Sequence, residues 1–149
     1  MTDTKADALA TRVAHAMLSR EGTGPAWQLV IEEARLGYAR VRMLGRPDMA
    51  NGHGIIHGGM IFALADTAFA YACNSRNVTA VAASATIAFL SPARIGETLV
   101  AEADERMREG RSGAYSVSVR TADGRAIAEF QGVSREIVGA ILDPLEESA

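Results

Sequence analysis

Residues 51–73 read N-G-H-G-I-I-H-G-G-M-I-F-A-L-A-D-T-A-F-A-Y-A-C, and this stretch decides the fold. Its second part, residues 60–73, has the length and composition of a helix that is apolar on every face apart from Asp66 and Thr67. Such a helix is buried either in a protein core or in a membrane. A mid-helix Asp costs about 2.5–3.5 kcal/mol on membrane-insertion scales, and the chain offers neither a second span nor a basic flank. The sequence therefore predicts a core helix and no membrane span.

A glycine-rich loop leads into this helix. Residues 45–59 carry Pro47, His53 and His57 among several glycines, which is the composition of a loop. The loop is longer than a plain connection, and long structured loops in compact domains are often functional. The most informative segment of the chain is therefore residues 51–67, where this loop meets the helix.

Strand-like patterns occupy most of the remaining chain. Residues 38–44 alternate with a period of two, and the run 27–34 precedes them across Leu36-Gly37, so the two favour a hairpin. Four further runs follow, separated by turn signals of which Asp123-Gly124 is the strongest. Strands joined by short turns favour an antiparallel meander. These four runs are 78–90, 98–108, 113–121 and 125–136.

The order of these elements predicts an α+β fold, in which one antiparallel sheet wraps around one central apolar helix. A wrapped helix needs no polar face, which explains the composition of residues 60–73. A second, amphipathic helix is expected over residues 5–20, and residues 139–149 are expected to form a loose tail.

Composition narrows the classes of partner. The 149 residues fit a single domain spanning 1–149, and 15 Lys+Arg against 18 Asp+Glu give no electrostatic signature of nucleic-acid or anionic-membrane binding. One cysteine excludes an intramolecular disulfide framework and a cysteine-based zinc site. Residues 1–18 lack the apolar segment of a secretory signal, so a cytoplasmic protein is expected. Alanine is abundant and large side chains are few, so a subunit interface would help to stabilise the fold.

Asp66 is the most unusual residue of the helix. The residues three, four and seven positions away cannot pair with a carboxylate, so burial without a partner should raise the pKa of Asp66. A group of this kind indicates function. The alternative is an Asp that meets water or an Arg from elsewhere in the fold. The neighbours are Gly59, Phe62, Ala63, Phe69, Ala70 and Cys73.

The helix start is the second candidate. His57, Gly58 and Gly59 directly precede the helix, and a helix start has unpaired N–H groups and the positive end of the helix dipole. Glycines let a ligand approach the backbone closely, so this end suits an anion or a developing oxyanion. The alternative is a flexible turn with no function.

The spacing of the two candidates predicts a site made by two chains. Gly59 and Asp66 are seven residues apart, which is about 10 Å along a helix. One carbonyl cannot easily contact both groups of the same helix. Two such helices lying antiparallel across a two-fold axis would bring each Asp66 near the helix start of the other chain.

Other polar residues of the loop have weaker signals. His53, His57 and an Asp resemble a metal site, but no nearby Cys or Glu completes a ligand set, so no metal is expected. Asn51 or His57 would position a water molecule or a substrate group, although Asn51-Gly52 is equally a turn signal. Cys73 lies at a helix end rather than a helix start, which favours a buried structural cysteine.

The pattern N-G-H-G-x-x-H-G-G-x-x-F-x-L-A-D-T-A-F-A-Y-A-C-N-S resembles the hotdog-fold thioesterases, and most closely their phenylacetate-degradation (phenylacetyl-CoA) branch. Weaker matches at 83–92, 96–99 and 110–115 extend the resemblance over about residues 25–136. The resemblance implies a curved antiparallel sheet around a central helix, a homodimer often paired into a homotetramer, and hydrolysis of acyl-CoA thioesters without a metal or an organic cofactor.

The resemblance also implies residue roles. Asp66 would be the catalytic carboxylate, as general base or as nucleophile. Gly59, next to Gly58, would polarise the thioester carbonyl through its backbone N–H and so form an oxyanion hole. The remaining matching positions would line the site or orient water and Asp66. These are Asn51, His57 and Thr67.

The sequence departs from the family in two ways, in the residues around the helix start and at the two termini. The pairs Ile55-Ile56 and Met60-Ile61 would reshape the acyl pocket, while a helical extension over 1–22 and a tail over 137–149 would either cover the pocket or add an interface. CoA carries phosphates that arginine binds well. The candidates for that contact are Arg94, Arg106, Arg108 and Arg111.

Two other functions remain open on the sequence. A non-catalytic acyl-CoA-binding hotdog module would bind the ester without turnover, and the presence of Asp66 argues against it. A hotdog enoyl-CoA hydratase or dehydratase would use a His with a carboxylate, and the position of His57 before the helix fits that chemistry poorly.

Overall fold

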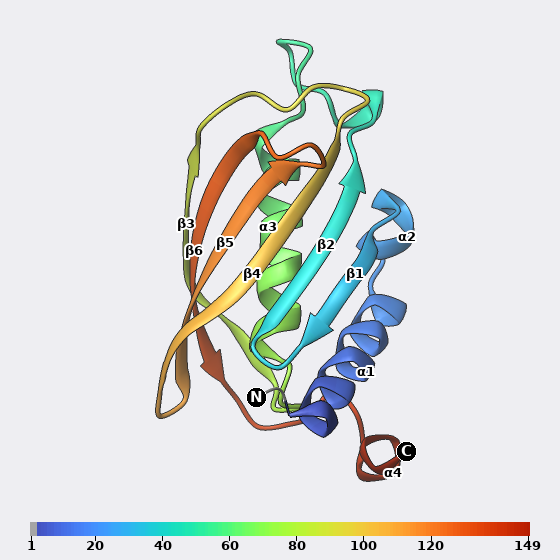
Figure 1. Cartoon of the computed structure of the whole chain (residues 1–149), viewed down its shortest axis with the longest axis vertical. Coiled ribbons are helices and arrows are strands. Elements are labelled where there is room, and N and C mark those ends of the chain that lie inside the picture. Colours follow the sequence, from blue (N-terminus) through green and yellow to red (C-terminus); the bar gives the residue numbers. More distant parts are fainter. Residues whose placement is uncertain (1–2) are drawn as a thin grey trace.

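The computed structural model describes residues 3–149 and places helix α3 (Gly58–Cys73) against a six-stranded antiparallel sheet (Figure 1). The sheet order is β1-β2-β4-β5-β6-β3, and α3 packs on all six strands. The predicted α+β arrangement of a sheet wrapped around a central helix is therefore confirmed. The strands are β1 (Val30–Arg35), β2 (Tyr38–Leu44), β3 (Ala80–Phe89), β4 (Thr98–Glu109), β5 (Ser112–Thr121) and β6 (Ala126–Glu136).

Small side chains let the sheet approach the helix closely. On β4 the inward positions Ala101 and Ala103 are fully buried, and a Cβ on Gly132 of β6 would lie only 2.9 Å from the ring of Phe69. The bulk of the core comes from a few aromatic rings, with the Phe69 centroid 5.4 Å from that of Tyr115. Edge-on aromatic contacts of this kind stabilise a core beyond the area they bury. The abundant alanine thus serves close packing.

One face of α3 is left uncovered by the sheet, which corrects the expectation of a helix buried on every side. Eight of its residues are buried, while residues at spacings of three, four, seven, eight and eleven from Gly59 are partly exposed. These spacings define a single helix face. We call this face the open stripe. It consists of Gly59, Phe62, Ala63, Asp66, Thr67 and Ala70.

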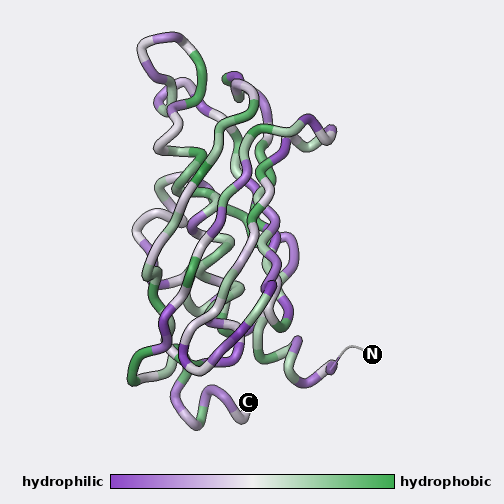
Figure 2. Tube along the Cα trace, turned by 90° about the vertical axis from the view of Figure 1, so that its left-hand side faces the viewer, coloured by the Kyte–Doolittle hydropathy of each residue, from purple (hydrophilic) through white to green (hydrophobic). Residues whose placement is uncertain are grey.

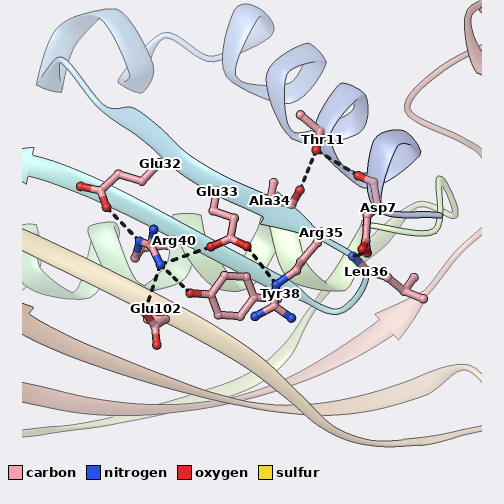
Figure 3. Close-up of polar contacts among 10 residues, drawn as sticks. All are labelled: Asp7, Thr11, Glu32, Glu33, Ala34, Arg35, Leu36, Tyr38, Arg40 and Glu102. Carbon is pink, nitrogen blue, oxygen red and sulfur yellow. Dashed lines mark hydrogen bonds and ion pairs between the residues drawn. The ribbon is translucent and has the colours of Figure 1, made fainter. Parts of the chain in front are cut away.

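The two edge strands of the sheet differ in whether another element lies beside them. Beside β1 lies α1 (Thr4–Arg20), where the Thr11 hydroxyl donates to the carbonyl oxygen of Ala34 at 2.7 Å and Asp7 accepts from the Leu36 N–H at 2.9 Å (Figure 3). The other edge is β3, which pairs only with β6 in the described chain (Figure 2 views the molecule from this side). An unpaired strand edge is a template for another strand.

The termini differ from the sequence-based expectations. Residues 23–27, expected as loop and strand, form the short helix α2 (Thr23–Trp27), which ends at Gln28 in a left-handed conformation, so β1 begins only at Val30. The expected loose tail instead contains α4 (Pro144–Ser148), capped by Asp143. The Asn77 side chain fastens that tail by accepting from the N–H of Leu142 at 2.8 Å.

Both terminal segments pack away from the start of α3. The two chain ends lie at the opposite end of the molecule from that start (Figure 1). Within one chain, therefore, α4 adds contacts to α1, where Arg12 donates to the carbonyl oxygen of Glu147 at 2.7 Å, and does not cover the helix start. No helix within residues 3–149 is long and apolar enough to cross a membrane.

Candidate functional site

Backbone hydrogen bonds fix the start of α3 in space. The predicted loop contains a short 3-10 helix, Pro47–Met49, and the His57 N–H donates to the carbonyl oxygen of Met49 at 2.8 Å. The Ile56 N–H donates to the carbonyl oxygen of Ala93 at 2.8 Å, which ties the loop to the connection between β3 and β4. The glycine-rich loop is therefore held on both sides, and the first turn of α3 has a defined position.

The His57 side chain caps the helix. Its Nδ1 accepts a hydrogen bond from the Gly59 N–H at 2.8 Å, so Nδ1 carries no proton in this arrangement. The Gly58 N–H has no hydrogen-bond partner among the described residues. The donor free to meet a ligand is thus Gly58. The Gly59 N–H, which the sequence singled out as the oxyanion donor, is accessible only if the imidazole moves aside.

Asp66 lies half-buried on the open stripe, and its carboxylate has no hydrogen bond or ion pair with any residue in 3–149. Burial raises its pKa above the ordinary value of an aspartate. This agrees with the sequence argument that no residue at helical spacing can pair with it. An unpaired carboxylate on a buried helix can take a proton from water or attack a carbonyl carbon.

Cys73, seven residues further along α3, behaves as expected for a structural cysteine. Burial, together with the nearby charge of Asp66, raises the pKa of its thiol to about 12. A thiol with that pKa carries almost no thiolate at neutral pH. The buried position and raised pKa of Cys73 fit the structural role that the sequence favours.

Asn51 and Thr67 each use part of their hydrogen-bonding capacity on the backbone. Asn51 Oδ1 accepts from the His53 N–H at 2.9 Å and so forms the turn that its sequence suggested. Its Nδ2 has no partner in the described part of the chain, and Asn51 also lines a cavity. The Thr67 hydroxyl donates to the carbonyl oxygen of Ala63 at 2.8 Å, which leaves only its oxygen lone pairs for the open stripe.

A cavity of about 350 Å³ opens at the start of α3. The loop and helix supply Asn51, Ile55, Ile56, Gly58 and Ile61, which the sequence had placed near the site. Sequence reasoning missed the other wall, which comes from the end of β3 and the following connection. The sequence pattern at 83–92 carries only the family resemblance, because no local signal indicates that a strand end some thirty residues away reaches the helix start. That wall is Phe89, Leu90, Ser91, Pro92 and Ala93.

The arginine candidates do not converge on the helix start within one chain. Arg94 follows the cavity-lining Ala93 and is exposed. The other three lie on the hairpin between β4 and β5, whose turn is at the opposite end of the molecule (Figure 1). Of these, Arg108 is already paired with Glu136 and lies 3.5 Å from Glu105. The remaining two are Arg106 and Arg111.

The described chain holds no group of three or more His, Cys, Asp or Glu residues that could bind a metal ion. His53 lies in the turn of the loop and His57 caps the helix, so the two histidines have different surroundings. At this site, the groups of α3 without a partner in the described chain are the Asp66 carboxylate and the Gly58 N–H. Gly58 and Asp66 are eight residues apart on one helix, a separation of about 12 Å along its axis.

Comparison with known proteins gives consistent matches. The model of the thioesterase superfamily matches residues 53–128. The acyl-coenzyme A thioesterase PaaI of Escherichia coli K12 is 41% identical over 128 residues, covering 86% of this chain and 91% of that protein. The structure of E. coli PaaI, from the phenylacetic acid degradation operon, superimposes with a TM-score of 0.88 at 40% identity over 90% of this chain and 97% of that one.

A second solved structure is also similar. It is a mutant of the phenylacetic acid degradation protein PaaI from Thermus thermophilus, with a TM-score of 0.75 and 33% identity. The match covers 78% of this chain and 100% of that one, so part of this chain has no counterpart in that protein.

Proposed function

The chain belongs to the thioesterase superfamily and has the hotdog fold, and from this premise we propose that it hydrolyses acyl-CoA thioesters to a free acid and coenzyme A. The observation that carries the proposal is the unpaired, half-buried carboxylate of Asp66 on the open stripe. A carboxylate kept without a partner lowers stability, so a catalytic use accounts for it better than packing does.

The helix start supplies the second part of the reaction. The thioester carbonyl oxygen accepts from the free Gly58 N–H, and also from the Gly59 N–H once the His57 imidazole is displaced. Negative charge that develops on this oxygen is stabilised by the donors and by the helix dipole. We propose that Asn51, through its free Nδ2, and Thr67, through its hydroxyl oxygen, orient water or substrate.

Asp66 then acts in one of two ways. As a general base, it takes a proton from water while the hydroxide adds to the carbonyl carbon, after which the C–S bond breaks and the CoA thiolate leaves and takes up a proton. As a nucleophile, it adds to the carbonyl carbon, CoA thiolate leaves, and water hydrolyses the resulting anhydride. Both routes yield one acid and one thiol for each water consumed.

We propose that the complete site spans two chains. Residues 62 and 63 are the midpoint between Gly59 and Asp66 and lie on the open stripe. Two open stripes that cross there in antiparallel orientation bring Asp66 of one chain next to Gly59 of the partner subunit. The unpaired edge of β3 supports such an assembly, because it can continue the sheet into a second chain. A homodimer is expected, with a homotetramer as a dimer of dimers, and light scattering measures both.

Mixed subunits test the two-chain site. Asp66→Asn removes the carboxylate, and Gly58→Pro removes the free N–H. If each site takes Asp66 from one chain and Gly58 from the other, co-expressing the two inactive variants under different tags yields mixed dimers with one intact site. We expect thiol release from purified mixed dimers far above the residual release from either variant alone. Inactive mixed dimers would show that both groups act within one chain.

The substrate proposal is tested by a panel of acyl-CoA esters. We propose that the substrates carry neutral acyl groups, including aromatic ones such as phenylacetyl. The assay measures the free thiol released from short, long, branched and aromatic acyl-CoA esters. Binding without turnover of any ester would indicate a non-catalytic acyl-CoA-binding module. Hydration of crotonyl-CoA without thiol release would indicate a hydratase.

Three further proposals concern the folding unit, the cellular location and the residue that contacts CoA. We propose that residues 1–149 fold as one unit, which predicts one cooperative thermal transition. We also propose a cytoplasmic location, which cell fractionation tests.

We propose that an arginine side chain binds the phosphates of CoA, and Arg94 is the candidate because it lies beside the cavity. If it does, Arg94→Ala should raise the KM for acyl-CoA.

A further inference from the structure

The ring of Phe89 stands against the start of α3. A Cβ placed on Gly58 would lie 3.0 Å from Cζ of this ring, so the ring rests directly on the glycine backbone. Phe89 also lines the cavity, yet 54% of its surface is exposed in the described chain. A large apolar ring left half uncovered beside an apolar cavity has surface available for a ligand.

Small neighbours give the ring this position. On β6 the residue directly across from Phe89 is Ala128, and on α3 the contact is a glycine. Cross-strand neighbours of this spacing normally pack side chain against side chain. Here neither neighbour has a bulky side chain, so the ring can lie against the helix start and form a wall of the cavity.

The lining chemistry defines the kind of group that fits. Six of the other residues around the cavity are apolar, and among the lining residues of the described chain none is charged. Burying a charged acyl group there would leave it without a partner, which is costly. The cavity therefore suits an uncharged, apolar group. The six are Ile55, Ile56, Ile61, Leu90, Pro92 and Ala93.

From this placement we infer that Phe89 is the residue that sets the size of the acyl group, an inference that rests on the proposed thioesterase activity. A carbonyl held by the Gly58 N–H has its acyl chain beginning within contact distance of the Phe89 ring. The ring then limits how much of the cavity the chain can fill. Phe89 acts on specificity and takes no part in bond making or breaking.

Replacing the ring should change selectivity. For Phe89→Leu and Phe89→Ala we expect the ratio of kcat/KM for a bulky ester to that for a short one, such as phenylacetyl-CoA to butyryl-CoA, to rise about tenfold or more. Hydrophobic pockets discriminate about 10- to 200-fold for each methylene. Phe89→Trp should shift the ratio the other way. In the wild type, succinyl-CoA should be a much poorer substrate than butyryl-CoA.

Ile95→Ala is the matched control. Ile95 is a similarly exposed apolar residue, 42% exposed, in the connection that follows β3, and it does not line the cavity. Its selectivity ratio should equal that of the wild type. Light scattering and thermal unfolding of every variant separate a change in the pocket from a change in assembly or folding.

The outcomes are distinct. A wild type that hydrolyses none of the thioesters overturns the proposed function itself. A wild type that is active, with Phe89 variants that are folded and lose activity equally on all esters, overturns the size-setting role alone. Loss of the dimer together with uniform loss of activity would assign the ring to the subunit interface and also overturn it. A shift in the ratio in both Phe89→Leu and Phe89→Trp, in opposite directions, supports it.

Discussion

The two ends of α3 use polar groups in opposite ways. At the start, the Gly58 N–H is free, and further along the same helix Asp66 has no partner among the described residues. At the end, the buried Asn74 donates to the carbonyl oxygen of Ala80 at 3.1 Å and accepts from its N–H at 2.9 Å. Buried polar groups that are fully satisfied stabilise a fold, whereas unsatisfied ones lower its stability. The end of α3 at Asn74 therefore stabilises the fold, whereas its first part has polar groups available for chemistry.

The satisfied end extends into the sheet. Arg76 forms two hydrogen bonds to Glu105, at 2.7 and 3.0 Å, and the Tyr115 hydroxyl donates to the same carboxylate at 3.0 Å. Burial disfavours the charge on Glu105, but the bonds from Arg76 and Tyr115 outweigh it and hold the pKa of Glu105 below its ordinary value. Asp66 has burial without such bonds, so its pKa moves in the opposite direction.

The largest effect is expected for Asp66→Asn. Loss of a general base typically lowers the reaction rate about 10²–10⁴-fold, so the rate of thiol release should fall about 10²-fold or more. Because the folded-state pKa of Asp66 is raised, its contribution to stability is fully present below the ordinary Asp pKa and declines as pH rises through the raised value. At neutral pH the variant should therefore unfold at the same temperature as the wild type or higher. A clear fall in Tm would show that the carboxylate has a structural partner.

The next effect tests the helix start itself. Proline is tolerated at the first position of a helix, and His57 already has the extended backbone (ψ 134°) that a following proline requires. Gly58→Pro therefore removes the N–H without breaking α3, and kcat should fall about 10²–10³-fold. Gly58→Ala is the control, because it places the same Cβ against Phe89 but keeps the N–H. Equal losses in both variants would mean that crowding, and not the donor, is responsible.

A variant at the other end should show the reverse pattern. Asn74→Ala leaves the N–H and carbonyl oxygen of Ala80 buried without their side-chain partner, which should lower the free energy of unfolding by about 2 kcal/mol. Chemical denaturation measures this change. Under conditions where the variant is fully folded, kcat should match the wild type. A lowered kcat in folded protein would connect this end to catalysis and weaken the division between the two ends.

The smallest expected effect is the pH-dependent change in thermal stability on replacing Glu105. Because the pKa of Glu105 is lowered, its stabilising contribution is present above its ordinary pKa and is lost as pH falls through the lowered value. Glu105→Gln should therefore unfold a few degrees below the wild type at pH 7, where 1 kcal/mol corresponds to about 2–4 °C. This difference should shrink below about pH 4, the region where carboxylates protonate. A difference that is constant with pH would show that shape, not charge, matters at this position.

Much of the fold could be predicted from local patterns. The apolar run 60–73, the alternation in 38–44 and the turn at Asp123-Gly124 each specify their element through residues adjacent in sequence. Asp66 was predictable as an unpaired group, because helical spacing alone decides which side chains of α3 it can reach. The helix start expected at residue 60 is two residues late, because the His57 side chain caps the first turn by accepting from the Gly59 N–H.

The sequence by itself determined the class of fold, the position of the carboxylate and the glycine-rich start of the helix, because these depend on periodicity and on residue type. Only the tertiary structure decided that one face of α3 stays open, that the His57 imidazole occupies the Gly59 N–H, and that Phe89 rests on Gly58. It also decided that Asn77 fastens the C-terminal tail. Each of these depends on which distant segments meet when the sheet curves around the helix, and no local pattern in the chain encodes such contacts.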